Sequence, residues 1–193
     1  IGKLIQLNRY CVAFNFLDFF NIIVKANEST SKLLLNAAFF VCKCCLDNHI
    51  IAQETFDTVC NNVPALIEFY ESQNYNLRLN MNNLFAAFVR YFAEMKTDQV
   101  QQYGSAIFSI TDIFFDFLPY TDDFELTFPT LEALCLLNNY LIDHEYIDSA
   151  ITADYTSRFI DCMTEMQRSD DQNISELTGK MLLSLNEKQK FNN

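Results

Sequence analysis

The chain has few of the residues that end regular elements and build tight turns. Its 193 residues include three glycines, three prolines and no tryptophan. Because Gly and Pro punctuate short strands and hairpins, their scarcity argues against a fold of many short strands. The longest apolar runs, such as residues 33–42, stop well short of the roughly 20 residues that span a bilayer, so we expect no transmembrane segment. With half of its residues apolar and a fifth charged, the chain is expected to be globular and all-α.

Positive charge is scarce as well. Lys and Arg total 13 against 25 Asp and Glu, which gives a net charge of −12. A phosphate backbone or an anionic membrane would be repelled on average, so we expect neither nucleic acid nor a membrane as partner and favour a basic protein or peptide.

The seven cysteines are odd in number and irregularly spaced, and no secretion signal opens the chain. We therefore expect a cytoplasmic or nuclear protein without a disulfide framework.

A pattern recurs along the chain. A carboxylate framed by apolar residues occurs at Asp18, Glu68, Asp112 and Asp161, and a polar turn follows each of them. Long segments come next, with apolar residues at steps of three and four, as a helix with one buried face requires. These segments are residues 32–45, 77–94, 131–143 and 174–185. Two of them end alike, in Leu46-Asp47-Asn48-His49 and Ile142-Asp143-His144, which lie 96 residues apart, so the period is about 48.

A unit of that length cannot close a core alone and has to bury its apolar faces against neighbouring units. We expect one domain, residues 1–193, of four approximate repeats: 1–48, 49–97, 98–144 and 145–193. Each repeat is expected to hold a short, a medium and a long helix. A bend between the first two favours residues that tolerate positive φ, and Asn61-Asn62, Gly104 and Asp154 stand at the corresponding places. Pro64 then suits the first turn of the second helix.

Three stretches resemble armadillo repeats: VPALI at 63–67, YGSAI at 103–107 and EALCLLNN at 132–139. The last is most similar to the third helix of the importin-α branch. The resemblance implies an armadillo- or HEAT-like right-handed α-solenoid of about four repeats. It also implies a non-enzymatic scaffold that binds a protein or an extended peptide, with a nuclear-transport adaptor as its specific version.

In the importin-α branch, Trp and Asn side chains on the long helices line a groove that clamps a basic peptide. Alignment of three long helices on their acidic ends puts Phe39, Ala86 and Cys135 at the Trp positions, and Lys43, Arg90 and Asn139 at the Asn positions. The resemblance therefore implies these groove residues: Phe39, Lys43, Arg90, Glu132, Cys135 and Asn139. Only Asn139 matches the ladder. Lys43 and Arg90 would repel a lysine-rich peptide, which predicts a groove adapted to another partner.

Other candidate sites favour structural roles. Cys42, Cys44 and Cys45 lie near His49, but residues two apart on a helix point in different directions, so we expect core thiols rather than a metal site. His49 and His144 end equivalent helices, and the framed acids are expected to face solvent or to bond locally. The chain has no glycine-rich phosphate loop, GxSxG or HExxH motif. We expect no catalytic residue, no metal and no cofactor.

An alternative remains open. Proteins of the Bcl-2 kind are compact, all-helical regulators that bind a partner helix in a hydrophobic groove, and they share this size and this acidic, aromatic-rich composition. The repeat separates the two hypotheses, because a compact bundle has no reason to carry one framed acid per 48 residues or so. The sequence predicts no oligomeric state.

Overall fold

The computed structural model describes residues 16–26, 30–49, 51, 53–94, 100–121, 123–143 and 149–191. The chain divides into two compact units, residues 1–110 and residues 111–193, and each is described by itself. Every regular element of the described residues is a helix, as the composition predicts. Within these residues no helix is both long enough and apolar enough to cross a membrane.

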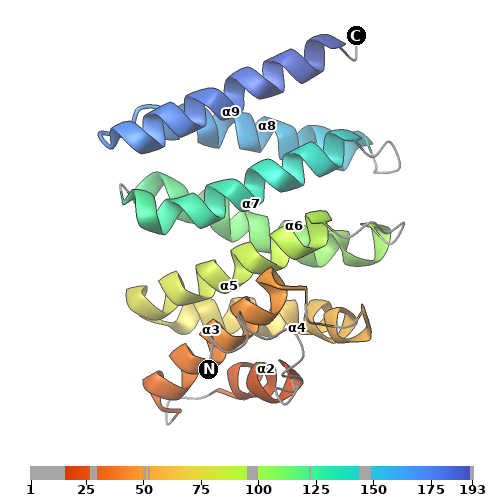
Figure 1. The fold of residues 1–193 in the computed structure, drawn as a ribbon, viewed down its shortest axis with the longest axis vertical. Helices are drawn as coiled ribbons and strands as arrows, with labels where there is room; N and C mark the ends of the chain where they lie inside the picture. Colours follow the sequence, from red (N-terminus) through yellow and green to blue (C-terminus); the bar gives the residue numbers. More distant parts are fainter. Residues whose placement is uncertain are drawn as a thin grey trace. The chain divides into compact units, whose positions relative to one another are not determined.

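The first unit contains α2 (Phe16–Val24), α3 (Lys32–Asp47), α4 (Gln53–Ser72), α5 (Tyr75–Glu94) and the first part of α6 (Val100–Phe117) (Figure 1). Helix α3 packs against both α2 and α5, and α4 contacts α2 and α5. The core of this unit is rich in phenylalanine. Phe20, Phe56 and Phe88 are fully buried, and the ring of Phe88 meets the other two with centroid distances of 6.4 and 6.2 Å.

The second unit contains the end of α6, the 3-10 helix η1 (Leu118–Tyr120), α7 (Phe124–Asp143), α8 (Ser149–Met166) and α9 (Gln172–Phe191). Helix α8 packs against α9, against α7 and against η1, and α7 also packs against α9. Tyr155 on α8 ties this unit together, because its buried hydroxyl donates a hydrogen bond to the carbonyl of Leu134 on α7 at 3.1 Å.

The long segments predicted from apolar spacing are helices in the structure. Helices α5, α7 and α9 begin at residues 75, 124 and 172, which are 49 and 48 residues apart. Helix α7 begins seven residues before the segment predicted to start at residue 131. Asp123 caps its first turn, since its carboxylate accepts a hydrogen bond from the backbone N–H of Glu125 at 3.0 Å. Pro129 lies inside this helix, whereas the predicted segment begins two residues after that proline.

The prediction of a bend between a short and a medium helix is wrong. Helix α4 runs without interruption through Asn61-Asn62 and Pro64, α6 runs through Gly104, and α8 runs through Asp154. None of the described glycines has a positive φ. Within the described residues, the helices therefore follow one another in pairs rather than in threes: α2 and α3, α4 and α5, α6 and α7, and α8 and α9. Three of these pairs, α2 with α3, α4 with α5 and α8 with α9, pack against each other.

Burial explains why α4 continues. Its buried residues recur at steps of three and four on both sides of the proline: Phe56, Val59, Val63, Leu66 and Tyr70. That single stripe holds the whole length of the helix against the core, which outweighs the one backbone hydrogen bond that Pro64 cannot donate. The local turn signal of Asn61-Asn62 is overridden by this packing.

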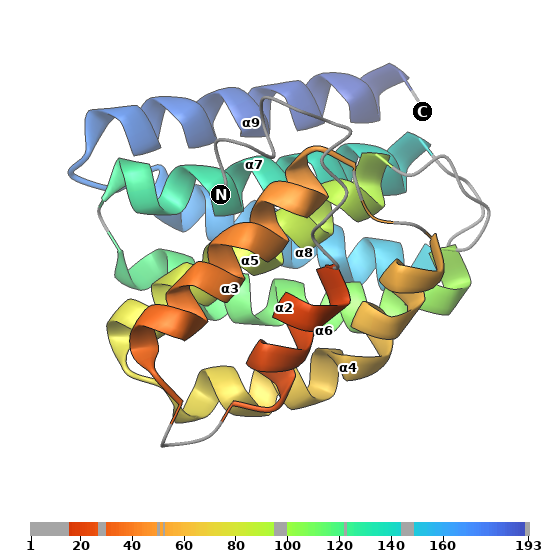
Figure 2. The ribbon, with the colours of Figure 1, turned by 60° about the horizontal axis from the view of Figure 1, so that its bottom comes forward.

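Helices α3 and α5 lie side by side and run in the same direction (Figure 2). The Nδ2 atom of Asn80 donates a hydrogen bond to Oδ1 of Asn36 at 2.9 Å, and these residues are 44 positions apart. Eleven residues further along α3, Asp47 accepts a hydrogen bond from Arg90, which is 43 positions away and ten residues further along α5. The nearly constant offset shows that the two helices are parallel and in register.

The same kind of offset occurs twice more. The hydroxyl of Tyr103 on α6 donates a hydrogen bond to the carboxylate of Asp57 on α4, 46 residues earlier, within the first unit. In the second unit, Arg158 on α8 donates to Asp112 on α6, again 46 residues earlier. Helices that hold equivalent places in successive helix pairs thus bond to each other within each unit.

Candidate functional site

The surface that α3 and α5 share brings together polar side chains from two helices of the first unit. We call it the α3–α5 seam and define it by Asn36, Phe40, Lys43 and Asp47 on α3 and by Asn80 and Arg90 on α5. Because the two helices are parallel, their first turns lie at one end of the seam and their last turns at the other. The two ends differ in chemistry.

A pocket of about 320 Å³ opens where α3 and α5 begin. We call it the amide pocket, and its lining residues are Lys32, Asn36, Asn74, Tyr75, Asn76, Leu77 and Asn80. The four carboxamides each present both hydrogen-bond donors and an acceptor. The ring of Tyr75 beside them is 57% exposed. None of these lining residues is acidic, although the chain as a whole carries a net charge of −12.

The start of α5 explains how the amide pocket is held. The side-chain oxygen of Asn74 accepts a hydrogen bond from the backbone N–H of Leu77 at 3.2 Å, which caps the helix. The guanidinium of Arg78 donates to the last carbonyls of α4, those of Tyr70 at 3.1 Å and Glu71. It also lies over the ring of Tyr70, 5.3 Å from its centroid. The turn between α4 and α5 is therefore fixed from both sides.

The other end of the seam is charged. The carboxylate of Asp47 accepts from Nζ of Lys43 through one oxygen and, at 2.8 Å, from Nη2 of Arg90 through the other. The positive charge expected at residues 43 and 90 is thus shared with a carboxylate that the sequence argument had not included. One net positive charge remains among these three groups.

His49 follows the last turn of α3 and contacts the end of α5, at the charged end of the seam. It has a φ of 50° just after α3, and its backbone N–H donates to the carbonyl of Leu46 at 2.9 Å. Its Nε2 lies 2.8 Å from Oε2 of Glu94, and its ring stacks on that of Tyr91 with centroids 5.3 Å apart. These contacts agree with the expected structural role of a histidine that ends its helix. His144 lies outside the described residues.

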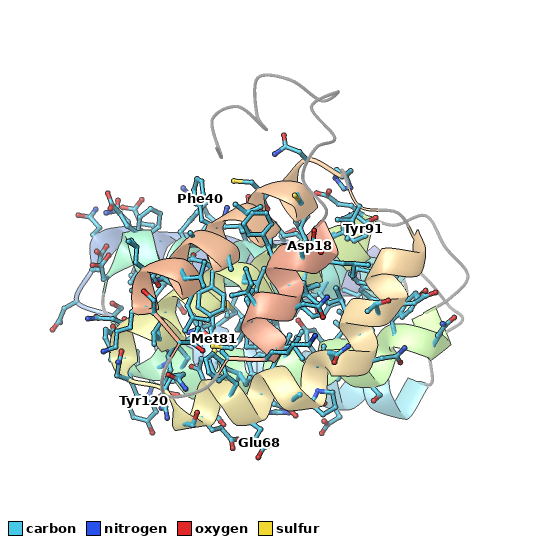
Figure 3. All side chains as sticks on the ribbon, turned by 90° about the horizontal axis from the view of Figure 1, so that it is seen from below. Asp18, Phe40, Glu68, Met81, Tyr91 and Tyr120 are labelled. Atoms are coloured by element: carbon cyan, nitrogen blue, oxygen red, sulfur yellow. The ribbon has the colours of Figure 1, made fainter. Side chains whose placement is uncertain are left out.

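Apolar side chains border the seam along α3. Leu33 is 80% exposed and Phe40 is 52% exposed, and Ala37 between them is also exposed. Steps of four and three residues place the three side chains on one face of the helix. Figure 3 shows Phe40 projecting outward from α3. The seam therefore offers carboxamides at one end, charges at the other and an apolar stripe beside them.

Some of the residues expected to line a groove lie on the surface, and others are buried in the core. Lys43 and Arg90 lie on the seam, but Phe39 is only 2% exposed and Ala86 is fully buried, so the side chains at these two supposed Trp positions pack into the core. Both had been aligned with surface positions, and that alignment is wrong for them. Phe40, the next residue, is the exposed one.

The remaining three expected groove residues lie on α7, in the second unit. Glu132, Cys135 and Asn139 are all half-buried, and Nδ2 of Asn139 lies 3.8 Å from the sulfur of Cys135. Steps of three and four residues put them on one face of the helix. That they share one groove with Lys43 and Arg90 stays a prediction.

The cysteine cluster belongs to the core, as expected. Cys42, Cys44 and Cys45 are all buried. Burial, with the neighbouring Cys44, raises the pKa of the Cys45 thiol to about 11, and burial, with Cys45, raises the pKa of Cys42 even further. Burial also raises the pKa of Cys44, and because a thiol binds a metal as the thiolate, burial opposes metal binding by these three residues. Among the described residues no group of three metal-binding side chains converges.

The four framed acids face solvent. Asp18, Glu68, Asp112 and Asp161 are all exposed. Asp112 also pairs with Arg158. This placement confirms the expectation that they face solvent or bond locally.

Sequence reasoning missed the amide pocket. The relevant signal is the density of asparagine in residues 74–83, NYNLRLNMNN, which holds five asparagines within ten positions. Asn36 could not be added to them from the sequence, because its contact with Asn80 depends on the register between two helices. Comparison of the chain with protein-family models, with curated proteins and with solved structures gave no match.

Proposed function

We propose that the chain is a helical-repeat scaffold, an armadillo- or HEAT-like right-handed α-solenoid, that binds an extended segment of a partner protein along the α3–α5 seam. The observation that carries the proposal is the amide pocket. An extended peptide presents alternating N–H and C=O groups, and a carboxamide satisfies either of them. Four carboxamides in one pocket therefore suit a peptide backbone whose own hydrogen bonds are unmade.

The offset between bonded helices supports the solenoid part of the proposal. The bonds between equivalent helices span 43 to 46 residues in both units. A stack of similar hairpins predicts such an offset, and a compact bundle of the Bcl-2 kind does not. The succession of helix pairs in the described residues suits the two-helix repeat of the HEAT class better than the three-helix armadillo repeat.

The charges along the seam favour a partner segment that is not rich in lysine. Lys32 contributes the only formal charge to the described lining of the amide pocket, and the carboxylate of Asp47 is already shared by two cations. The apolar stripe of Leu33 and Phe40 favours apolar side chains in the bound segment. A role in nuclear transport gains no support, because the residues at two ladder positions are buried.

Peptide selection tests the proposal. Short random peptides displayed on phage are selected against the full chain, and the best one is titrated by fluorescence anisotropy. The double variant Asn36→Ala/Asn80→Ala is expected to weaken binding about tenfold, because two hydrogen bonds to the backbone are lost. The control Asn21→Ala/Asn173→Ala removes two exposed carboxamides elsewhere and leaves binding unchanged. A selection without enrichment, or binding that the first double variant leaves unchanged, contradicts the proposal.

A further inference from the structure

A second surface lies on the outer side of α4. A groove of about 400 Å³ runs between α4 and the first part of α6, entirely within the first unit. We call it the α4–α6 groove. In Figure 3, Glu68 projects from α4 on the side opposite to that from which Phe40 leaves α3. The groove is therefore separate from the α3–α5 seam, and an occupant of one leaves the other open.

Small and apolar side chains form the floor of the α4–α6 groove. Val63, Pro64 and Ile67 contribute from α4, and Ala106 contributes from α6. The two helices approach each other where Tyr103 near the start of α6 bonds to Asp57 near the start of α4, and the groove follows directly after this bond along both helices. Small side chains from two neighbouring helices line this groove, and the ridge of a third helix fits into a groove of this kind.

The charged side chains that line the groove are both carboxylates, and Ser105 and Ser109 add two hydroxyls. Glu68 and Glu71 both line the groove, both are exposed, and the structure pairs neither carboxylate with a cation from the described residues. Pro64 has no N–H to donate to the carbonyl of Cys60, a residue that also lines the groove. None of the described lining residues is a lysine or an arginine.

The spacing of the two carboxylates adds to this picture. Glu68 and Glu71 stand three residues apart on one face of α4, and like charges at that spacing repel each other. A cation from outside relieves the repulsion. The net charge of −12 attracts a basic partner over a longer range as well.

We propose that the α4–α6 groove binds a basic amphipathic helix of a partner protein. One apolar side chain of that helix lies among Val63, Ile67 and Ala106, and two Lys or Arg residues one turn apart pair with Glu68 and Glu71. A helix with one apolar side chain between cations of this spacing matches both the floor and the rim. The basic partner that the composition favours would thus bind in the α4–α6 groove.

This inference is tested by selecting peptides that bind the full chain from a library of helix-forming peptides. The positions on one face of the library helix are randomised. Enriched peptides are expected to carry two cations one turn apart beside an apolar residue. Their affinity, measured by anisotropy, should fall about five- to tenfold in Glu68→Gln/Glu71→Gln. The control Asp161→Asn/Glu165→Gln removes the same charge from exposed positions of α8 and should change affinity less than twofold.

Two further variants make the test specific. Ala106→Met fills the floor without changing charge and should also weaken binding, whereas Asn36→Ala/Asn80→Ala on the seam should not. Charge reversal, Glu68→Lys/Glu71→Lys with a peptide whose cations are replaced by Glu, should restore binding. Circular dichroism and urea unfolding check that each variant is folded. No enrichment, enriched peptides without the cation pair, or peptides that respond to the seam variant instead would overturn the proposal.

Discussion

Arg90 on α5 donates a hydrogen bond to Asp47 on α3, with Nη2 and Oδ1 2.8 Å apart. The two residues are 43 positions apart and hold similar places near the ends of their helices. Together with the bond between Asn36 and Asn80, this pair fixes the register of the α3–α5 seam. Lys43 and Arg90, the two positive charges expected on this surface, both pair with the carboxylate of Asp47.

Loss of Arg90 should loosen this end of the seam. Arg90→Ala is expected to lower the free energy of unfolding by about 1 kcal/mol, because a partly exposed ion pair and the packing of a long side chain are lost together. Urea unfolding measures the change. Arg168→Ala, at an exposed position after α8, is the matched control and should have almost no effect. Equal effects of the two variants would remove the assigned role of Arg90.

The bond between Tyr103 and Asp57 should contribute more. Tyr103→Phe keeps the buried ring and its edge-on contact with Phe56 but removes the donor to a carboxylate. We expect a loss of about 2 kcal/mol in the free energy of unfolding. Tyr91→Phe removes a hydrogen bond to a neutral carbonyl, that of Ile51 at 3.2 Å, and should cost about half as much or less. The reverse order would show that the Asp57 contact adds little.

A buried carboxamide in α5 predicts a gain. Asn82 is 1% exposed, and neither amide atom of its side chain has a hydrogen-bond partner among the described residues. Leu has the same number and branching of side-chain heavy atoms as Asn, so Asn82→Leu should raise the free energy of unfolding by about 1 kcal/mol. In Asn138 only the side-chain oxygen lacks a hydrogen-bond partner among the described residues, so Asn138→Leu should raise the free energy of unfolding by less. A lower urea midpoint for Asn82→Leu would contradict this account of the core.

Alkaline pH should weaken the fold through the buried thiols. Burial, with Asp57, raises the pKa of Cys60 to about 12, and burial, with Glu165, does the same for Cys162. An unfolded thiol ionises near a pKa of about 8.5. Between the two values the unfolded chain releases protons that the folded chain keeps, so the free energy of unfolding falls as pH rises and is fully retained below the lower value.

Urea unfolding at about pH 8 and about pH 10 measures this decline. Cys60→Ala removes one of the thiols and should make the decline shallower, even though the variant is less stable at both pH values. A decline of the same size in the variant and the parent chain would show that Cys60 does not contribute.

The sequence predicted the long helices because burial leaves a periodic trace. Apolar residues at steps of three and four mark α3 and α5 within a few residues of their observed ends. The bend at Asn61-Asn62 failed for the opposite reason. Residues that favour turns locally lie on the exposed side of α4, while the stripe from Phe56 to Tyr70 holds the helix straight. Local preference was visible in the sequence, and the tertiary packing that overrides it was not.

The candidate site was harder to predict than the fold. A shift of one position turns a side chain by about 100° around a helix, so an alignment that selects Phe39 instead of Phe40 exchanges a core residue for an exposed one. The amide pocket depends on Asn36 and Asn80, which are 44 positions apart, and on the parallel register of their helices. No periodicity within one helix contains that information.

Hydrogen exchange of the full chain, with and without the peptide selected for the seam, tests the central claim most directly. An extended segment on the α3–α5 seam should slow the exchange of amides in the first turns of α3 and α5, around Asn36 and Asn76, and leave the outer side of α4 unchanged. Protection confined to α4, or to helices of the second unit, would contradict the account and place the peptide on another surface.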